Sequence, residues 1–339
     1  MGELSSGYRP AWWLQNPHLQ TLWGKFLRRT PSQPTALERL DTPDGDFLEI
    51  HHLSGPEGAP LLVLLHGLEG GIRSHYIQGL LGEAKARGWR AAVLVFRSCG
   101  PEMNRTPRSY HSGETADLAF TIDYLANRFP SVPLLLTGAS LGGNVLLKYL
   151  GEQGNGPHPR IKGAVAISVP FDLERASRHI GQGFARVYQE NFLRSLRRKA
   201  GIKLERYPDL VDSEKLRSAR TMFDFDDAFT APVHGFLDAQ DYYSRSSSLG
   251  WLDQISVNTL LLSAIDDPFL PAQVLREVRE VASRNPSLDV EFTPRGGHVG
   301  FVAGLNPLRP AYYLEKRAGD FLARQIRRLK TTDPHSRER

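Results

Sequence analysis

Cysteine is nearly absent from the chain, which has only Cys99 among its 339 residues. An internal disulfide is therefore excluded, and nothing in the sequence requires an oxidising compartment. Long apolar runs are absent too, because the main uninterrupted ones, at 61–65 and 91–96, have the length of strands. The N-terminus has no basic start followed by an apolar run, so we expect no signal peptide and a cytoplasmic location.

An excess of charge of one sign is also missing. The 42 basic and 37 acidic residues leave a net charge of +5, which is too small and too dispersed to indicate a nucleic-acid partner. Basic residues gather at 194–203 and at 324–330. We interpret both groups as solvated helix faces, and peripheral attraction to an anionic membrane or lipid is the alternative. The oligomeric state is left open.

Strand-like and helix-like segments alternate through most of the chain. Apolar residues make up 40% of it and charged residues 23%, which is ordinary for a globular protein with a sizeable core. The expected strands are 47–53, 61–65, 90–96, 134–136, 161–169, 259–263 and 288–293. Repeated strand–helix units predict a mainly parallel sheet flanked by helices on both faces.

Two segments depart from this alternation. Residues 1–45 contain three tryptophans and are expected to pack on the core, which we assign to 46–170 and 251–330. Residues 171–250 have helical stretches without a convincing strand, and we interpret them as a mostly helical cap inserted into the core. The polar tail, 331–339, is expected to be disordered.

The stretch around Ser140 carries the clearest chemical signal. An apolar strand leads into Gly138-Ala-Ser140-Leu-Gly142, and residues with helical spacing follow. This is G-x-S-x-G in the strand–turn–helix context that gives the motif its meaning. Gly138 and Gly142 have no Cβ to collide with a serine on a sharp turn. The motif predicts Ser140 as a nucleophile, and a glycine-rich turn with a chance serine is the alternative.

A serine hydroxyl needs a histidine to take its proton and a carboxylate to orient that histidine. After a serine in such a turn, the acid and then the histidine are expected in loops that follow strands. Asp266 and Asp267 follow the strand 259–263 and compete for the acid role. We favour Asp267, because it directly precedes the proline that forces the turn. His298 follows the next strand among glycines and is the predicted base.

An oxyanion hole needs two backbone N–H donors. We predict the N–H of Leu141, which follows the nucleophile, and the N–H of Leu68 in the loop after the strand 61–65. His66 is interpreted as a hydrogen-bond partner that fixes this loop, and Cys99 as a small packed residue. Histidine and aspartate are otherwise scattered without ligand spacing, so we expect no metal and no cofactor.

Several ordered motifs together resemble one family. They are Trp-Trp-Leu-Gln-Asn-Pro-His-Leu-Gln-Thr at 12–21, His-Gly-Leu-Glu-Gly at 66–70, Tyr-His-Ser-Gly-Glu-Thr-Ala-Asp at 110–117, Gly-Ala-Ser-Leu-Gly-Gly at 138–143, Asp-Ala-Gln-Asp-Tyr-Tyr at 238–243, Asp-Asp-Pro-Phe at 266–269 and Gly-Gly-His at 296–298. In nearly its whole length the chain resembles the YheT-like α/β-hydrolases. These are related to membrane-anchored ABHD-type lipases and to yeast medium-chain ethyl-ester synthase/esterases.

The resemblance implies an α/β-hydrolase fold and esterase-type activity on short- or medium-chain acyl esters, with lipase or acyltransferase activity in some relatives. Carried over by position, it implies Ser140 as nucleophile, Asp267 as acid and His298 as base. One departure is Ser98, because the family's Arg-Gly-Cys pattern has glycine at this position.

Three functions are compatible with these residues. We favour a serine carboxylesterase that hydrolyses short- to medium-chain acyl esters, with acylglycerols among the candidates, through an acyl-enzyme on the Ser-Asp-His triad; its partner is a small-molecule ester. An alcohol O-acyltransferase or ester synthase would use the same triad, although no histidine has an aspartate five positions on, as an H-x4-D signature requires. A hydrolase-like binding protein without turnover is the third.

Overall fold

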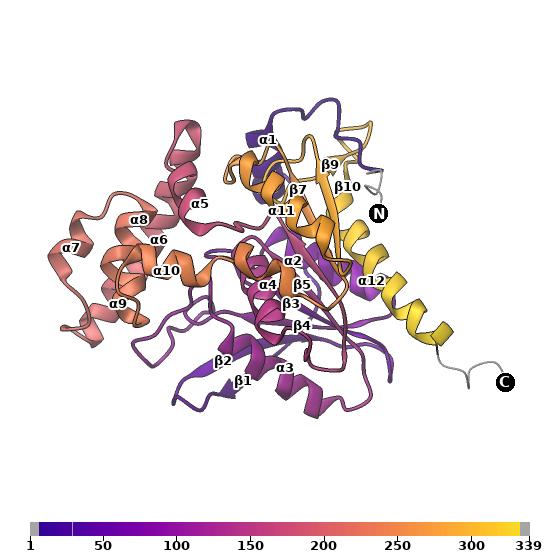
Figure 1. The fold of residues 1–339 in the computed structure, drawn as a ribbon, viewed down its shortest axis with the longest axis horizontal. Helices are drawn as coiled ribbons and strands as arrows, with labels where there is room; N and C mark the ends of the chain where they lie inside the picture. Colours follow the sequence, from indigo (N-terminus) through magenta and orange to yellow (C-terminus); the bar gives the residue numbers. More distant parts are fainter. Residues whose placement is uncertain (1–6, 29, 333–339) are drawn as a thin grey trace.

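The computed structural model describes residues 7–28 and 30–332, and its centre is an eight-stranded sheet (Figure 1). The strands are β1 (Ala36–Asp41), β2 (Phe47–Leu53), β3 (Leu61–Leu65), β4 (Arg90–Val95), β5 (Leu134–Ala139), β6 (Ile161–Ile167), β7 (Thr259–Ala264) and β8 (Leu288–Thr293). Their order is β1-β2-β4-β3-β5-β6-β7-β8. β2 pairs antiparallel with β1 and β4, and all other neighbours are parallel. The predicted α/β fold with a mainly parallel sheet is confirmed.

Helices cover both faces of the sheet. On one face lie α3 (Ala116–Arg128), α4 (Leu141–Gln153) and α11 (Ala272–Arg284). On the other lie α2 (His75–Ala86) and α12 (Tyr313–Thr332). The central strands are apolar throughout because side chains that alternate along a strand enter both of these cores.

The chain between β6 and β7 is helical. Its elements are α5 (Leu173–His179), η1 (Gly183–Ala185), α6 (Arg186–Arg206), α7 (Ser213–Ser218), α8 (Met222–Phe225), the π-helix η2 (Asp226–Thr230), α9 (Ala231–Val233), α10 (Ala239–Ser246) and η3 (Leu249–Gln254). Figure 1 shows α5 to α10 as a lobe on the side of the sheet opposite to α12. Part of this lobe has its own apolar core, formed by α6, α7 and α8 with η2. We keep the name cap for residues 171–250.

A buried cation on α6 ties the cap to the core. Lys203 is 1% exposed, and its Nζ donates to Asn104 Oδ1 at 2.8 Å and to the carbonyls of Thr106 and Arg108. Burial lowers the pKa of Lys203 to about 8. Asp46 also binds this loop, because its carboxylate accepts from the N–H of Thr106 and from the side-chain amide of Asn104. One loop of the core is therefore enclosed between α6 and the sheet edge.

The N-terminal segment packs on the far end of the chain. α1 (Pro17–Phe26) begins at a proline and lies beside β9 (Val302–Ala303), as Figure 1 shows. The Gln20 amide donates to the Val302 carbonyl at 3.1 Å and accepts from its N–H at 2.8 Å. β9 itself pairs antiparallel with β10 (Ala311–Tyr312).

Two details differ from the sequence expectations at the ends of the core. Residues 36–41, which fall within the predicted N-terminal segment, form the edge strand β1 of the main sheet. α12 continues through residue 332, so the first two residues of the predicted disordered tail are helical. The rest of that tail, 333–339, lies outside the described residues. Within residues 7–28 and 30–332, no helix combines the length and apolar character that a membrane span needs.

Candidate active site

Ser140 occupies the turn between β5 and α4. Its backbone has φ 54° and ψ −124°, in a region that non-glycine residues rarely adopt. A Cβ on Gly138 would collide with the carbonyl oxygen of Gly142, and a Cβ on Gly142 would collide with that of His66. The two glycines therefore allow the close approach of β5, α4 and the loop after β3 that the strained turn requires. Ser140 follows the carboxyl end of a central strand and directly precedes the N-terminus of α4.

His298 and Asp267 form a buried hydrogen-bonded pair. The imidazole Nδ1 lies 2.8 Å from Asp267 Oδ2, and the residues are 6% and 3% exposed. The other carboxylate oxygen of Asp267 accepts from the Phe269 N–H at 2.8 Å. Asp266, the competing candidate, instead accepts from the Gly297 N–H at 2.9 Å. Asp267 is thus hydrogen-bonded to the side chain of His298, whereas Asp266 is hydrogen-bonded to the backbone of the loop that contains His298.

Two contacts that the sequence did not reveal hold His298 in place. The backbone N–H of His298 donates to Thr21 Oγ1 at 2.9 Å, and the Thr21 hydroxyl donates to the Pro17 carbonyl. The Phe269 ring stacks on the imidazole, with ring centroids 4.1 Å apart and an interplanar angle of 19°. Thr21 and Phe269 both stand in motifs that carry the family resemblance, which is the one signal in the sequence that could have drawn attention to them.

The loop after β3, which lines both pockets with Ser140, contains a backbone donor without an acceptor among the described residues. The N–H of Gly67 donates to the Tyr76 hydroxyl and that of Glu69 to the Tyr110 hydroxyl, both at 2.8 Å. The N–H of Leu68 between them has no acceptor in the described part of the chain. Such an arrangement suits a donor kept for a ligand, because its neighbours are already satisfied.

His66 fixes the start of this loop. Its Nδ1 donates to the Gly67 carbonyl at 2.8 Å, and its Nε2 accepts from the Phe96 N–H at 3.1 Å. Burial lowers the pKa of His66 to about 4, so the ring is neutral at physiological pH and both nitrogens are occupied. His66 therefore links the ends of β3 and β4 and has no nitrogen left for proton transfer.

Glu69 joins the same loop to the cap. Its backbone has φ 53°, and its carboxylate accepts from the Tyr110 hydroxyl and from Lys199 Nζ, each at 2.7 Å, and from the Ser195 hydroxyl. Lys199 and Ser195 both lie on α6. Lys199 Nζ also lies 3.6 Å from Cys99 Sγ, and desolvation raises the pKa of that thiol to about 11. Cys99 is therefore a neutral thiol at physiological pH.

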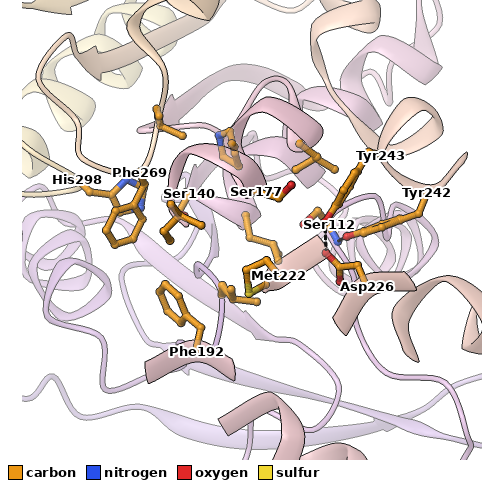
Figure 2. Close-up of a pocket in the computed structure, with 17 residues that line it drawn as sticks. Ser112, Ser140, Ser177, Phe192, Met222, Asp226, Tyr242, Tyr243, Phe269 and His298 are labelled. Carbon is orange, nitrogen blue, oxygen red and sulfur yellow. Dashed lines mark hydrogen bonds between the residues drawn. The ribbon is translucent and has the colours of Figure 1, made fainter. Parts of the chain in front are cut away.

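Two pockets meet at Ser140. The first, of about 100 Å³, runs into the cap, and the second, of about 1050 Å³, opens between α1 and the first turns of α6. Figure 2 shows the first pocket, with His298, Phe269 and Ser140 at one end. The side chains that line both pockets are Leu68, Ser140, Phe192, Phe269 and His298. Leu141 lines the first pocket, so four of the five candidate residues line that pocket, and Asp267, which lines neither pocket, joins them through its bond to His298.

The part of the chain that the structure describes has no candidate metal site. Among the residues that the structure describes, no group of three or more histidine, cysteine, aspartate or glutamate side chains is arranged to hold a metal ion.

Known proteins share this fold and much of this sequence. The chain matches the family described as "alpha/beta hydrolase fold" over residues 60–305. It is 39% identical to YheT of Escherichia coli, a protein classed by inference as an esterase, over 94% of this chain and 93% of that protein. It is 27% identical to phospholipase ABHD3 of Bos taurus over 94% of this chain and 79% of that one.

A solved structure supports the same fold. An esterase of Pyrococcus furiosus aligns with a TM-score of 0.57 at 18% identity, over 86% of this chain and 93% of that chain. Because the identity is low, this likeness concerns the fold alone. With the match over residues 60–305 and the identity to YheT along nearly its whole length, the chain belongs to the α/β-hydrolase family, in the group that includes YheT.

Proposed function

We propose that this α/β-hydrolase is a serine carboxylesterase that cleaves short- to medium-chain acyl esters through an acyl-enzyme. The observation that carries the proposal is the buried His298–Asp267 pair, whose histidine lines the same two pockets as Ser140, a serine on a strained turn. The relatives, named as esterase and phospholipase, support the broader statement that the chain is a carboxylic ester hydrolase.

The first half-reaction forms the acyl-enzyme. Ser140 Oγ attacks the ester carbonyl carbon while His298 Nε2 takes the hydroxyl proton, and the Nδ1–H bond to Asp267 stabilises the resulting imidazolium. The N–H groups of Leu68 and Leu141 donate to the oxyanion of the tetrahedral intermediate. The intermediate then expels the alcohol, whose oxygen receives the proton from His298, and the acyl group stays on Ser140.

The second half-reaction releases the acid. His298 takes a proton from a water molecule as that water attacks the acyl carbonyl, and the same two N–H groups hold the second oxyanion. Collapse returns the proton to Ser140 Oγ and frees the carboxylic acid. An alcohol in place of water would give a new ester, so product analysis with ethanol present separates hydrolysis from transfer.

Replacement of the nucleophile tests this proposal. We expect Ser140→Ala to lower the kcat for p-nitrophenyl acetate and butyrate by about a thousandfold or more, because the covalent route is lost. Ser283→Ala, on the exposed face of α11, is the matched control and should keep wild-type activity. A fluorophosphonate probe should label wild type and not Ser140→Ala. Undiminished turnover by folded Ser140→Ala would refute the proposal.

A further inference from the structure

The two pockets that meet at Ser140 differ in size by an order of magnitude, about 100 Å³ against about 1050 Å³. An ester has two limbs, the acyl chain and the alcohol. When its carbonyl lies between Ser140 and the N–H groups of Leu68 and Leu141, the limbs must leave in different directions. The size difference therefore bears directly on which esters fit.

The small pocket is closed at its far end by polar groups that already satisfy one another. Asp226 accepts from the Tyr243 hydroxyl at 2.7 Å and from the Thr230 hydroxyl at 2.6 Å. The Tyr242 hydroxyl accepts from the Ser112 N–H at 2.9 Å. In Figure 2 this group lies at the end away from His298, with Met222 between it and Ser140 in the view. These groups need no partner from a substrate.

This closed end limits the length of a chain in the small pocket. Its side walls are apolar, with Leu173, Ala176 and Ile180 of the α5 region and Leu270 among them. A short alkyl chain gains by contact with these walls. A longer one would press methylene groups against the hydrogen-bonded carboxylate of Asp226, where apolar burial brings no gain and polar groups would lose their partners.

Both pockets include His298 in their lining, and the residues around it divide unequally between them. Thr21, which accepts a hydrogen bond from His298, and Val299, which follows His298 in the sequence, line the large pocket and not the small one. Leu141 and Pro170, beside the elbow, line the small pocket and not the large one. The alcohol must leave from the side where His298 protonates it, so the large pocket suits the alcohol limb and the small pocket the acyl limb.

Apolar side chains from two elements form part of the large pocket, whose lining elsewhere includes the charged residues Arg28, Glu69 and Arg73. Leu22 and Phe26 line it from α1, and Phe184 and Val187 line it from η1 and α6. Phe26, Phe184 and Val187 are 67%, 54% and 58% exposed, although such side chains are normally buried. An apolar alcohol limb would cover them.

We propose that the substrates are esters of a short acyl group with a large, mostly apolar alcohol. This inference rests on the proposed ester hydrolysis and adds the division of the two limbs between two unequal pockets. It assigns Phe26, Phe184 and Val187 to recognition of the alcohol, and the Asp226–Tyr243 pair to the limit on acyl length.

Constitutional isomers test the division most directly. Octyl acetate and ethyl octanoate have the same atoms and differ only in which limb is long, and ethyl acetate serves as the short reference. We expect wild type to hydrolyse octyl acetate with a kcat/KM at least ten times that for ethyl octanoate. A smaller ratio, or the reverse order, overturns this inference while leaving ester hydrolysis intact. If none of the three is hydrolysed and Ser140 resists fluorophosphonate, the proposed function itself fails.

Two variants check the assignment of each pocket. Val187→Trp narrows the large pocket, so we expect its kcat/KM for octyl acetate to fall at least fivefold relative to that for ethyl acetate. Leu237→Trp, at a 91% exposed cap position that lines neither pocket, is the matched control and should leave this ratio unchanged. Met222→Ala lengthens the small pocket and should raise the rate for ethyl octanoate relative to ethyl acetate. Equal ratios in wild type and both pocket variants would contradict the assignment.

Discussion

Asp266 and Asp267 are neighbours in sequence with different partners. Asp267 accepts a hydrogen bond from the imidazole of His298, and Asp266 accepts one from the backbone of Gly297. The first bond fixes which ring nitrogen carries the proton, whereas the second only supports the loop.

The two aspartates therefore give a matched pair of substitutions. We expect Asp267→Asn to lower kcat/KM for p-nitrophenyl acetate by about a thousandfold or more, because the amide no longer selects the productive tautomer of His298. Asp266→Asn keeps an oxygen that accepts from Gly297, so its activity should stay within about threefold of wild type. Steady-state kinetics on both variants, with circular dichroism to verify folding, measure the contrast. Equal losses in the two variants would contradict the assignment of the acid.

The candidate site residues differ in whether the sequence around each one indicates its role. Ser140, Asp267 and His298 were predictable because each stands in a short motif at the end of an apolar strand. Thr21 was not, since its only link to catalysis is a bond to a residue 277 positions away. The hydroxyls of Tyr76 and Tyr110 were equally hidden, because nothing local shows that they occupy the N–H groups on either side of Leu68.

Ser98 illustrates a local departure that the structure explains. Its backbone has φ 62°, a left-handed conformation in which glycine carries no steric cost, and the resembling family has glycine there. The serine hydroxyl donates to Asn104 Oδ1, so the side chain gains a partner in that conformation. The substitution thus leaves the loop in place and adds a bond to the loop under α6.

Among the strands and helices, the degree of burial determined which ones could be predicted from the sequence. The central strands were predictable because they are apolar on both faces, whereas β1 was not, since it is a largely exposed edge strand. The π-helix η2 was also missed, because the spacing of apolar residues does not distinguish a single π-helical turn from an α-helix. That turn contains Asp226, whose carboxyl is 8% exposed.

The buried carboxyl in η2 predicts a pH-dependent stability. Burial raises the pKa of Asp226 to about 6, well above the ordinary range of an aspartate, so the folded protein binds this proton more tightly than the unfolded chain. The stabilisation by the protonated form is complete below about pH 4 and is lost as the pH rises through about 6. We expect Asp226→Asn, which stays neutral, to match wild type near pH 4 and to exceed its free energy of unfolding by up to about 3 kcal/mol at pH 8.

Urea unfolding of both proteins across this range measures the difference. A gap between Asp226→Asn and wild type that is constant from pH 4 to pH 8 would contradict the buried ionisation. Tyr243→Phe, which removes one donor to the carboxylate, should widen the wild-type pH dependence because the charged form loses a hydrogen bond.

For the whole molecule, Lys203 is one of the buried contacts that attach the cap to the core. Replacement by methionine would leave the oxygens of Asn104, Thr106 and Arg108 without their buried donor. We expect Lys203→Met to lower the free energy of unfolding by about 2 kcal/mol, because the three oxygens lose a charged donor and keep only neutral ones, from the Ser98 hydroxyl and the Asn104 amide. Lys215→Met, at a half-exposed ion pair with Asp227, is the control and should change it by less than about 0.5 kcal/mol.

Hydrogen exchange distinguishes a loosened cap from general destabilisation. In Lys203→Met, the amides of α6 and of residues 104–108 should exchange faster, while those of β3 and β5 keep their wild-type protection. Uniform acceleration through the sheet would show that Lys203 stabilises the whole fold and not the junction of cap and core.

The bond between Thr21 and His298 also has a consequence for the order in which the protein is made. α1 is made well before its partners Gly297, His298 and Val302, because 277 positions separate Thr21 from His298. Until these partners emerge, the Gln20 amide and the Thr21 hydroxyl have only local acceptors, the carbonyls of Leu14 and Pro17, and the apolar side of α1 stays uncovered. Ser140 is therefore synthesised before the segment that contains His298, and the proposed triad can assemble only after both α1 and the His298 loop have been made.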